Sequence, residues 1–246
     1  LRTQGALLKE VRELLTLSRG YGMESVRQRA MSAAETVSAS LSEVVDDSTL
    51  ELVVDLRLAF GRLLAALGAN ERAEKEHLDT AELSLSQGWT ETACAALALA
   101  SHAAQARGDR ASSGRAWHQC RDAMESWPMN RPGERCGILV DAVGDPLVAV
   151  QVLSALAEVL VDGVEEDHSR APIIREIISR ASEQASRCVS PPQGAVESLK
   201  GVIDDMPYDS EKTLDVTCEL VKSDDGKALY WAPKDPQVIR KFLDGE

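Results

Sequence analysis

The side chains best suited to chemistry in this chain are four histidines and five cysteines, and their spacing argues against a metal site. His118 and Cys120 stand two residues apart, which places them on different faces of a helix. Cys94 and His102 share a helical face but lie about 12 Å apart along the axis. Neither pair can hold one zinc ion with helical geometry. We therefore expect no metal and no other cofactor.

Catalysis by side chains alone has little more support. A cysteine and a histidine that are distant in the sequence can meet in the fold, so a Cys–His pair stays open as a minor alternative. The carboxylate pairs Glu165-Glu166 and Asp204-Asp205 fall in predicted loops, where they solvate the chain. Gly20-Tyr21-Gly22 follows a predicted helix and not a strand, so it does not predict a phosphate loop. We expect a protein that is not an enzyme.

The composition and charge narrow the class of partner. Of 246 residues, 44% are hydrophobic and 4% aromatic, so alanine, leucine and valine must fill the core. A net charge of −13 disfavours nucleic acid and anionic membrane surfaces and favours a basic protein or peptide, although solubility alone also explains it. An odd number of cysteines without a CxxC motif predicts a reduced, cytoplasmic protein, and no signal peptide opens the chain.

The longest apolar run, 146–161, predicts a buried core helix. Gln151, Ser154 and Glu158 interrupt it on one helical face, and a membrane span needs about 20 apolar residues. We expect no membrane partner. Because the first residue is Leu1 and not methionine, we expect the chain to be a piece of something longer or to have been trimmed.

Apolar residues at helical spacing run through most of the chain. They predict helices over about residues 4–19, 26–45, 49–67, 70–87, 90–107, 109–127, 133–143, 146–162, 172–188 and 193–204. Residues 216–222 and 227–231 flank Asp225-Gly226, which leaves two alternatives, a β-hairpin or a helix that ends at Lys222; we expect the helix. Asp235-Pro236 predicts the start of a final short capping helix.

Three glycine turns divide the middle of the chain. Gly68 and Gly108 are 40 residues apart, and Gly108 and Gly144 are 36 apart, a spacing typical of stacked helical hairpins. Aligned on these glycines, each hairpin carries one small residue in its first helix and one in its second. These are Gly61, Ser101 and Gly137 in the first helices, and Ala73, Ser113 and Ala149 in the second.

In these small residues the chain resembles the tetratricopeptide repeat family over about residues 54–162. Arg57 and Gly133 depart from the pattern where a bulky residue is usual, and His77 departs where an apolar one is. The resemblance implies an all-α fold of stacked antiparallel helical hairpins, an α-solenoid, with atypical flanking helices and an irregular C-terminal tail. We expect a helical-repeat domain over 1–222 and a C-terminal extension over 223–246.

In the resembled family the first helix of each pair lines an inner groove that binds peptides. Carried over residue by residue, the groove candidates are Asp55, Arg62, Ala65, Ala95, His102, Gln105, Arg131, Ile138 and Asp141. Tyr230 and Trp231 are candidate surface anchors for a partner, with packing against the end of the repeats as the alternative.

These observations predict a non-catalytic domain that binds a protein or peptide, basic or neutral, as an adaptor, chaperone or regulatory module. The alternative is a ligand- or peptide-sensing domain of a transcriptional or signalling regulator, which would need a closed apolar cavity between hairpins. An all-helical enzyme ranks third. The oligomeric state is left open, a homodimer included.

Overall fold

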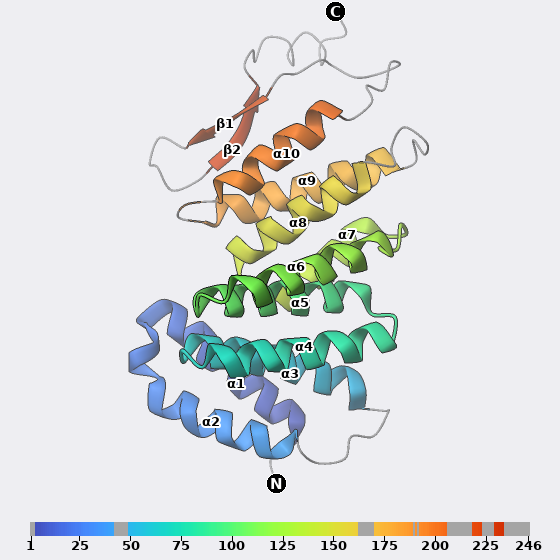
Figure 1. The fold of residues 1–246 in the computed structure, drawn as a ribbon. Coiled ribbons are helices and arrows are strands. Elements are labelled where there is room, and N and C mark those ends of the chain that lie inside the picture. The colour runs from blue at the N-terminus through green and yellow to red at the C-terminus, as the bar shows by residue number, and fades with distance from the viewer. Residues whose placement is uncertain are drawn as a thin grey trace, which may run out of the picture. The chain divides into compact units, whose positions relative to one another are not determined.

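The fold is all-α, with one short β-hairpin near the C-terminal end (Figure 1). Two compact units make up the chain. The first comprises Leu1–Trp127 with Asp141–Val143, and the second Pro128–Val140 with Gly144–Glu246. The computed structural model describes residues 3–41, 49–161, 170–188, 190, 192–205, 218–222 and 229–233.

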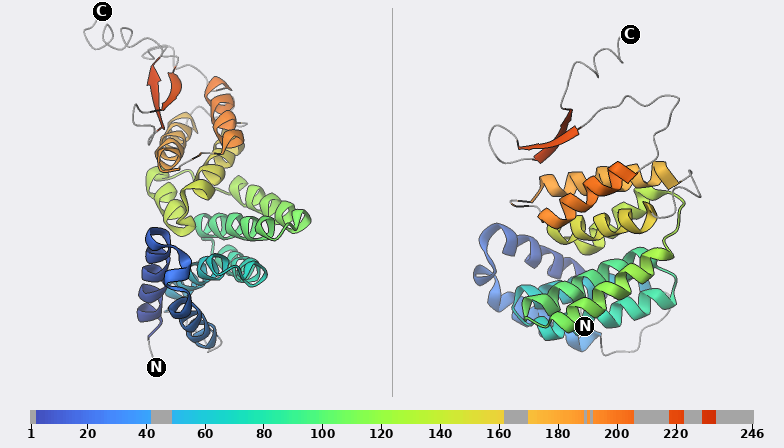
Figure 2. Two further views of the ribbon diagram at one scale, coloured as in Figure 1. Left: turned by 90° about the vertical axis from the view of Figure 1, so that its left-hand side faces the viewer. Right: turned by 45° about the horizontal axis from the view of Figure 1, so that its top comes forward.

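In the first unit, helices follow one another through short turns. Three-residue turns join α3 to α4, α4 to α5 and α5 to α6, so consecutive helices are antiparallel and α4 and α6 run in the same direction. Figures 1 and 2 both show α4 and α6 on one side of the unit, with α5 between and behind them. The elements are α1 (Gln4–Tyr21), the 3-10 turn η1 (Met23–Ser25), α2 (Arg27–Ser40), α3 (Leu50–Ala66), α4 (Asn70–Ser86), α5 (Thr90–Ala106) and α6 (Arg110–Glu125).

The three turns have one geometry. Gly68, Gly88 and Gly108 adopt φ values of 82°, 72° and 81°, a left-handed conformation that strains any residue with a Cβ. In each turn the amide after the glycine bonds back to a carbonyl of the last helical turn, as Ala69 N does to the Leu64 carbonyl at 2.9 Å. This is the Schellman arrangement, which ends a helix and reverses the chain. Because Gly88 belongs to the series, the turns recur every 20 residues, half the spacing that the sequence indicated.

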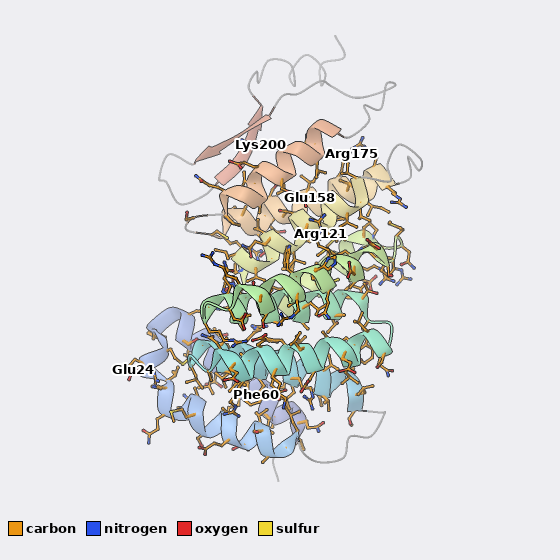
Figure 3. The ribbon with its side chains drawn as sticks, in the orientation of Figure 1. Glu24, Phe60, Arg121, Glu158, Arg175 and Lys200 are labelled. Carbon is orange, nitrogen blue, oxygen red and sulfur yellow. The ribbon has the colours of Figure 1, made fainter. Side chains whose placement is uncertain are left out.

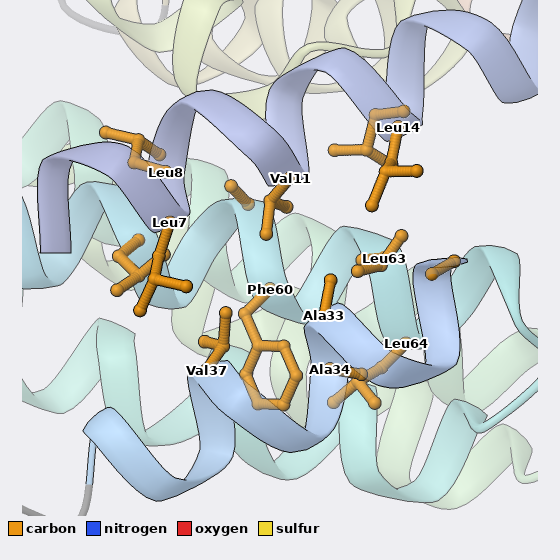
Figure 4. Packing of buried hydrophobic residues seen from close by; sticks show 14 of the residues in the cluster. Leu7, Leu8, Val11, Leu14, Ala33, Ala34, Val37, Phe60, Leu63 and Leu64 are labelled. Atoms are coloured by element: carbon orange, nitrogen blue, oxygen red, sulfur yellow. The ribbon is translucent and has the colours of Figure 1, made fainter. Parts of the chain in front are cut away.

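The core of the first three helices is aliphatic. Leu7, Val11 and Leu14 of α1 lie against Val37 of α2 and Phe60 of α3, and all five are fully buried (Figure 4). Figure 4 shows Phe60 inside this cluster, whereas Glu24 of η1 lies at the edge of the unit in Figure 3. Burying a large apolar side chain contributes roughly 1.5–3 kcal/mol, so this cluster holds α1 and α2 onto α3.

Helix α5 is the centre of the unit, because α4 packs along one side of it and α6 along the other. Every residue from Ala93 to Ser101 is buried, and five of these nine are alanine. Small side chains let both neighbours approach closely. At the crossing with α6, the Ser101 hydroxyl donates to the Ser113 carbonyl at 3.0 Å.

The small residues predicted at hairpin crossings behave differently from one hairpin to the next. A Cβ added to Gly61 would lie 2.4 Å from Cε1 of His77, so α3 and α4 can cross there only with glycine in place. Ser101 and Ser113 touch in the next hairpin. At Gly137, by contrast, no atom of the described residues lies within 4 Å of an added Cβ, so the third predicted crossing is not tight.

The second unit is built around an apolar helix. Helix α8 packs against α9 and α10, and its Glu158, labelled in Figure 3, accepts a hydrogen bond from Ser198 of α10. Ser154 is buried within α8, and its hydroxyl donates to the Val150 carbonyl at 2.7 Å. The helices are α7 (Pro132–Val143), α8 (Pro146–Val161), α9 (Arg170–Ser186) and α10 (Gln193–Asp205).

The expected helix ending at Lys222 is wrong. Strand β1 (Cys218–Lys222) pairs antiparallel with β2 (Leu229–Pro233), with Leu220 opposite Trp231. The pair therefore crosses the expected boundary at residue 223, and β2 lies against α9. The alternating β-formers around Asp225-Gly226 outweigh the helical pattern.

Three further expectations from the sequence concern acidic pairs, the C-terminal helix and membrane spans. The pair Asp204-Asp205 ends helix α10 and does not lie in a loop. The carboxylates Glu165-Glu166 and the capping helix after Asp235-Pro236 fall outside the described residues. In the described part of the chain, every helix is too short or too polar to cross a membrane, and α8, the most apolar, has 16 residues.

Replacing Gly61 by alanine should destabilise the first unit by about 1–3 kcal/mol, because the added methyl overlaps the buried His77 ring. In a His77→Ala background the same change should be neutral or stabilising, since alanine favours the helix by about 1 kcal/mol. Urea unfolding of the wild type, both single variants and the double variant measures the coupling. Additive effects would show that the ring does not restrict this position.

Candidate functional site

A hollow lies between α4 and α6 and is floored by Leu97 of α5. It has a volume of about 720 Å³. Its floor is buried and apolar, with Ala81, Leu97 and Ala116 each at most 3% exposed. The lining residues are Glu74, Leu78, Ala81, Glu82, Leu85, Leu97, Ser112, Arg115, Ala116, Gln119, Asp122, Ala123 and Ser126. We call this hollow the α4–α6 groove.

The groove is open along its rim. Glu82, Arg115, Gln119 and Asp122 are exposed, and Leu85 is an exposed large apolar side chain at 50%. Leu85 thus extends the apolar lining of the groove to its rim.

The end of the groove near the starts of both helices is internally charge-paired. Glu74 is buried and accepts hydrogen bonds from the Arg107 guanidinium, whose Nη2 also lies 3.3 Å from Asp109. These partners raise the pKa of Arg107, the hydrogen bond to Glu74 most of all. Hydrogen bonds from the backbone and hydroxyl of Ser112 lower the pKa of Asp109, which caps α6.

The remaining charges on the rim face solvent. Glu82 makes no ion pair with any residue that the structure describes. Asp122 has an exposed neighbour on its own helix, His118, at 3.6 Å. Arg115 donates to the Ser112 hydroxyl at 2.8 Å. The far half of the groove is therefore acidic on both walls, and the near half carries one arginine.

The predicted groove residues on α3 and α5 lie elsewhere. Asp55 pairs with Arg12 of α1 at 2.9 Å, and half-buried Arg62 donates to the Ala142 carbonyl, next to Asp141, at 3.4 Å. Ala95 is fully buried in α5, and Ala65 is half-buried against the core. The structure thus brings Arg62 near the Asp141 segment, and none of these residues lines the α4–α6 groove.

The other predicted residues are more exposed. His102 and Gln105 lie on the exposed face of α5. Arg131 and Ile138 do come together, along α7, where they line a hollow of about 220 Å³. The backbone of Arg131 has a left-handed φ of 50°, and its side chain forms an ion pair with Glu134 at 3.4 Å.

Two other sets of candidates add little to a site. Tyr230 and Trp231 are part of strand β2, and their side chains lie outside what the structure describes. No group of three or more His, Cys, Asp or Glu side chains in the described ranges is placed to hold a metal ion.

Two of the buried cysteines, Cys94 and Cys120, form a pair between α5 and α6. The Cys120 thiol donates to the Cys94 carbonyl at 3.4 Å, and the Cys94 thiol to the Cys120 carbonyl at 3.9 Å. The contact with Cys94, together with burial, raises the pKa of Cys120. A thiol that stays protonated is a poor nucleophile, so this pair serves packing.

His77 is the most unusual titratable group. It is 1% exposed, and its Nδ1 has no hydrogen-bond partner in the described structure. Burial, and secondarily the charge of Arg62, lower its pKa from 6.5 to about 3. His77 packs in the α3–α4 crossing and does not line the groove.

Sequence reasoning missed the groove because it took the binding face from the first helix of each pair. A signal was present in the second helices. Residues 74, 78, 81 and 85 of α4 and 112, 116, 119, 123 and 126 of α6 repeat at intervals of four and three, and all line the groove. Such regular stripes on two successive, largely polar helices could have marked a shared surface.

His77 should make the protein sensitive to acid. Its pKa is depressed in the folded state, so the unfolded chain binds the proton more readily, and stability falls as the pH drops from about 6.5 toward 3. The loss should reach roughly 2 kcal/mol by pH 5.

Urea unfolding at pH 7.5 and pH 5 would measure this loss, which a His77→Gln variant should largely lack. The exposed His102→Gln variant is the matched control and should keep the wild-type pH dependence. Equal pH dependence in all three proteins would contradict the assignment.

The comparisons with known proteins do not assign this chain to a family. No protein-family model matches the chain, and neither a curated protein nor a solved structure matches it. The functional argument therefore rests on the described residues themselves.

Proposed function

We propose that this protein is a non-catalytic, tetratricopeptide-like repeat module that binds a protein segment in the α4–α6 groove, as an adaptor, chaperone or regulatory domain. The observation that carries the proposal is the groove itself. Two equivalent helices of successive hairpins wall an open hollow of about 720 Å³ over a buried apolar floor.

The openness of the groove favours a protein segment over a small ligand. Small-molecule sites bury most of their ligand in a closed, mainly apolar pocket. Here Glu82, Leu85 and Asp122 stand exposed at the rim, so a ligand would keep one side in solvent, as a docked chain segment does. A ligand-sensing domain, the second candidate, would need a closed cavity, whereas the α4–α6 groove is open.

The repeat geometry supports the tetratricopeptide-like assignment. Schellman turns recur every 20 residues, Gly61 meets His77 at the α3–α4 crossing, and Ser101 meets Ser113 at the α5–α6 crossing. This geometric support for the assignment is limited to the α3–α4 and α5–α6 hairpins, because Gly137 of α7 does not make a tight crossing.

A binding role also suits the titratable groups. His77, with its strongly shifted pKa, is enclosed away from the groove, and Glu74 at the groove is held by Arg107. Cys94, Cys120 and Cys188 are free thiols, which supports a reducing compartment such as the cytoplasm.

A random library of peptides about 14 residues long, selected against the immobilised protein, tests the proposal. The selected peptides should bind a Leu85→Ser variant about tenfold more weakly than the wild type, because the substitution removes a side chain that lines the groove. Fluorescence anisotropy would measure the two affinities. Gln119→Trp, which fills the groove from its exposed rim, should have the same effect.

Met31→Ser is the matched control, because Met31 is as exposed as Leu85, at 51% against 50%, but lies on α2 outside the groove. It should leave binding unchanged. A His102→Ala variant tests the face of α5 instead. The proposal would be contradicted if the peptides bound the Leu85→Ser variant as tightly as the wild type but bound the His102→Ala variant more weakly. That result would place the binding site on the exposed face of α5.

A further inference from the structure

We infer that the segment bound in the α4–α6 groove is an amphipathic α-helix whose apolar residues repeat every three and four positions and whose flanks carry lysine or arginine. This inference rests on the proposed function, and it names the class of partner. It is argued from the periodicity, the depth and the charge of the two walls.

The first argument is periodicity. The α4 stripe is Glu74, Leu78, Ala81 and Leu85, and the α6 stripe is Ser112, Ala116, Gln119, Ala123 and Ser126. Both stripes advance by alternating steps of four and three residues, the spacing with which one helix faces another over a long seam. Since α4 and α6 run in the same direction, the two stripes present matching seams to whatever lies between them.

The second argument is the size of the side chains. Deep in the groove the walls carry Ala81 and Ala116, both 2% exposed, and Ala123 is half-buried. Small residues allow a third helix to approach until its larger side chains reach the floor at Leu97. An extended peptide places side chains alternately on two faces and would match this spacing poorly.

The third argument is length. The α6 stripe from Ser112 to Ser126 covers about 21 Å of helix axis, which a helix of about 14 residues matches. A helix of that length is marginal in water by itself, so it would fold as it docks.

The fourth argument is charge. Glu82 and Asp122 flank the far half of the groove, one on each wall, and the whole chain carries a net charge of −13. In paired helices, charges beside an apolar seam set the choice of partner. Lysine or arginine on the bound helix would meet these carboxylates. Arg115, on the near half, would meet an acidic residue, which fixes the direction of the helix.

Three synthetic peptides of about 14 residues test geometry and charge separately. The first has leucines at alternating steps of three and four residues, with lysines beside them. The second has the same composition with leucine at every second position, and the third replaces lysine by glutamate. The first should bind about tenfold tighter than either of the others and gain helicity in circular dichroism on binding.

A Glu82→Lys/Asp122→Lys double variant should reverse the preference between the lysine and glutamate peptides, because both side chains are exposed and the substitutions leave the core intact. Leu85→Ser should weaken the first peptide, and Met31→Ser should not. Salt should reduce the difference between the peptides, since the charges are solvent-exposed.

The outcomes separate the two proposals. If library peptides are sensitive to Leu85→Ser but the helical peptide binds no better than its alternating isomer, the helical partner is refuted and the binding groove stands. If no peptide is sensitive to Leu85→Ser, both fail. If the protein forms a dimer that Leu85→Ser dissociates, a second copy occupies the groove, and the inference of a basic helical partner is overturned.

Discussion

The left-handed glycine turn is the constraint on which the first unit depends. Gly68, Gly88 and Gly108 each end a helix with the same Schellman hydrogen bonds, and each reverses the chain after the same interval. Helices α3 to α5 therefore have equal length, and α4 and α6 run in the same direction along the two sides of α5. A substitution that moved one turn would shift one wall of the groove against the other.

Small side chains allow the helices that these turns connect to pack closely against one another. Alanines on α5 let α4 and α6 pack along both of its sides, and Gly61 admits the His77 ring at the α3–α4 crossing. Because α5 is occupied on both sides, its neighbours cannot close over it, and a space remains between them. The groove itself takes Leu97 from α5 and its alanines, Ala81, Ala116 and Ala123, from α4 and α6.

The sequence predicted the helices well because their apolar periodicity and glycine turns are local signals. It placed every described helix and identified Gly61, Ser101 and Ser113 as small crossing residues, two of which touch. It misassigned residues 218–222 because so short a segment suits a helix or a strand, and pairing with Leu229–Pro233 selects the hairpin that Asp225-Gly226 had offered as the alternative. The loose surroundings of Gly137 are likewise a property of packing and not of residue type.

The candidate site was harder to predict, because a groove is made by the distance between helices. His102 and Gln105 were chosen by correspondence with a resembled family, and the structure places them on an exposed face. The residues that do line a hollow, such as Leu78 and Gln119, belong to polar helices and carry no catalytic or metal-binding chemistry. Their shared interval becomes informative once α4 and α6 are known to be neighbours across α5.

The chemistry of the groove also limits how tightly it can bind. Its floor offers alanine and leucine methyl groups and no aromatic side chain, whereas the strongest contacts in protein interfaces usually come from buried tryptophan, tyrosine and arginine. When a helix folds as it docks, part of the favourable contact free energy is offset by the entropy lost in ordering the peptide. Exposed carboxylates such as Glu82 and Asp122 add modest attraction and more selectivity. An open, alanine-lined groove with acidic edges is therefore suited to reversible recognition, in which charge and spacing select the partner and no single contact holds it.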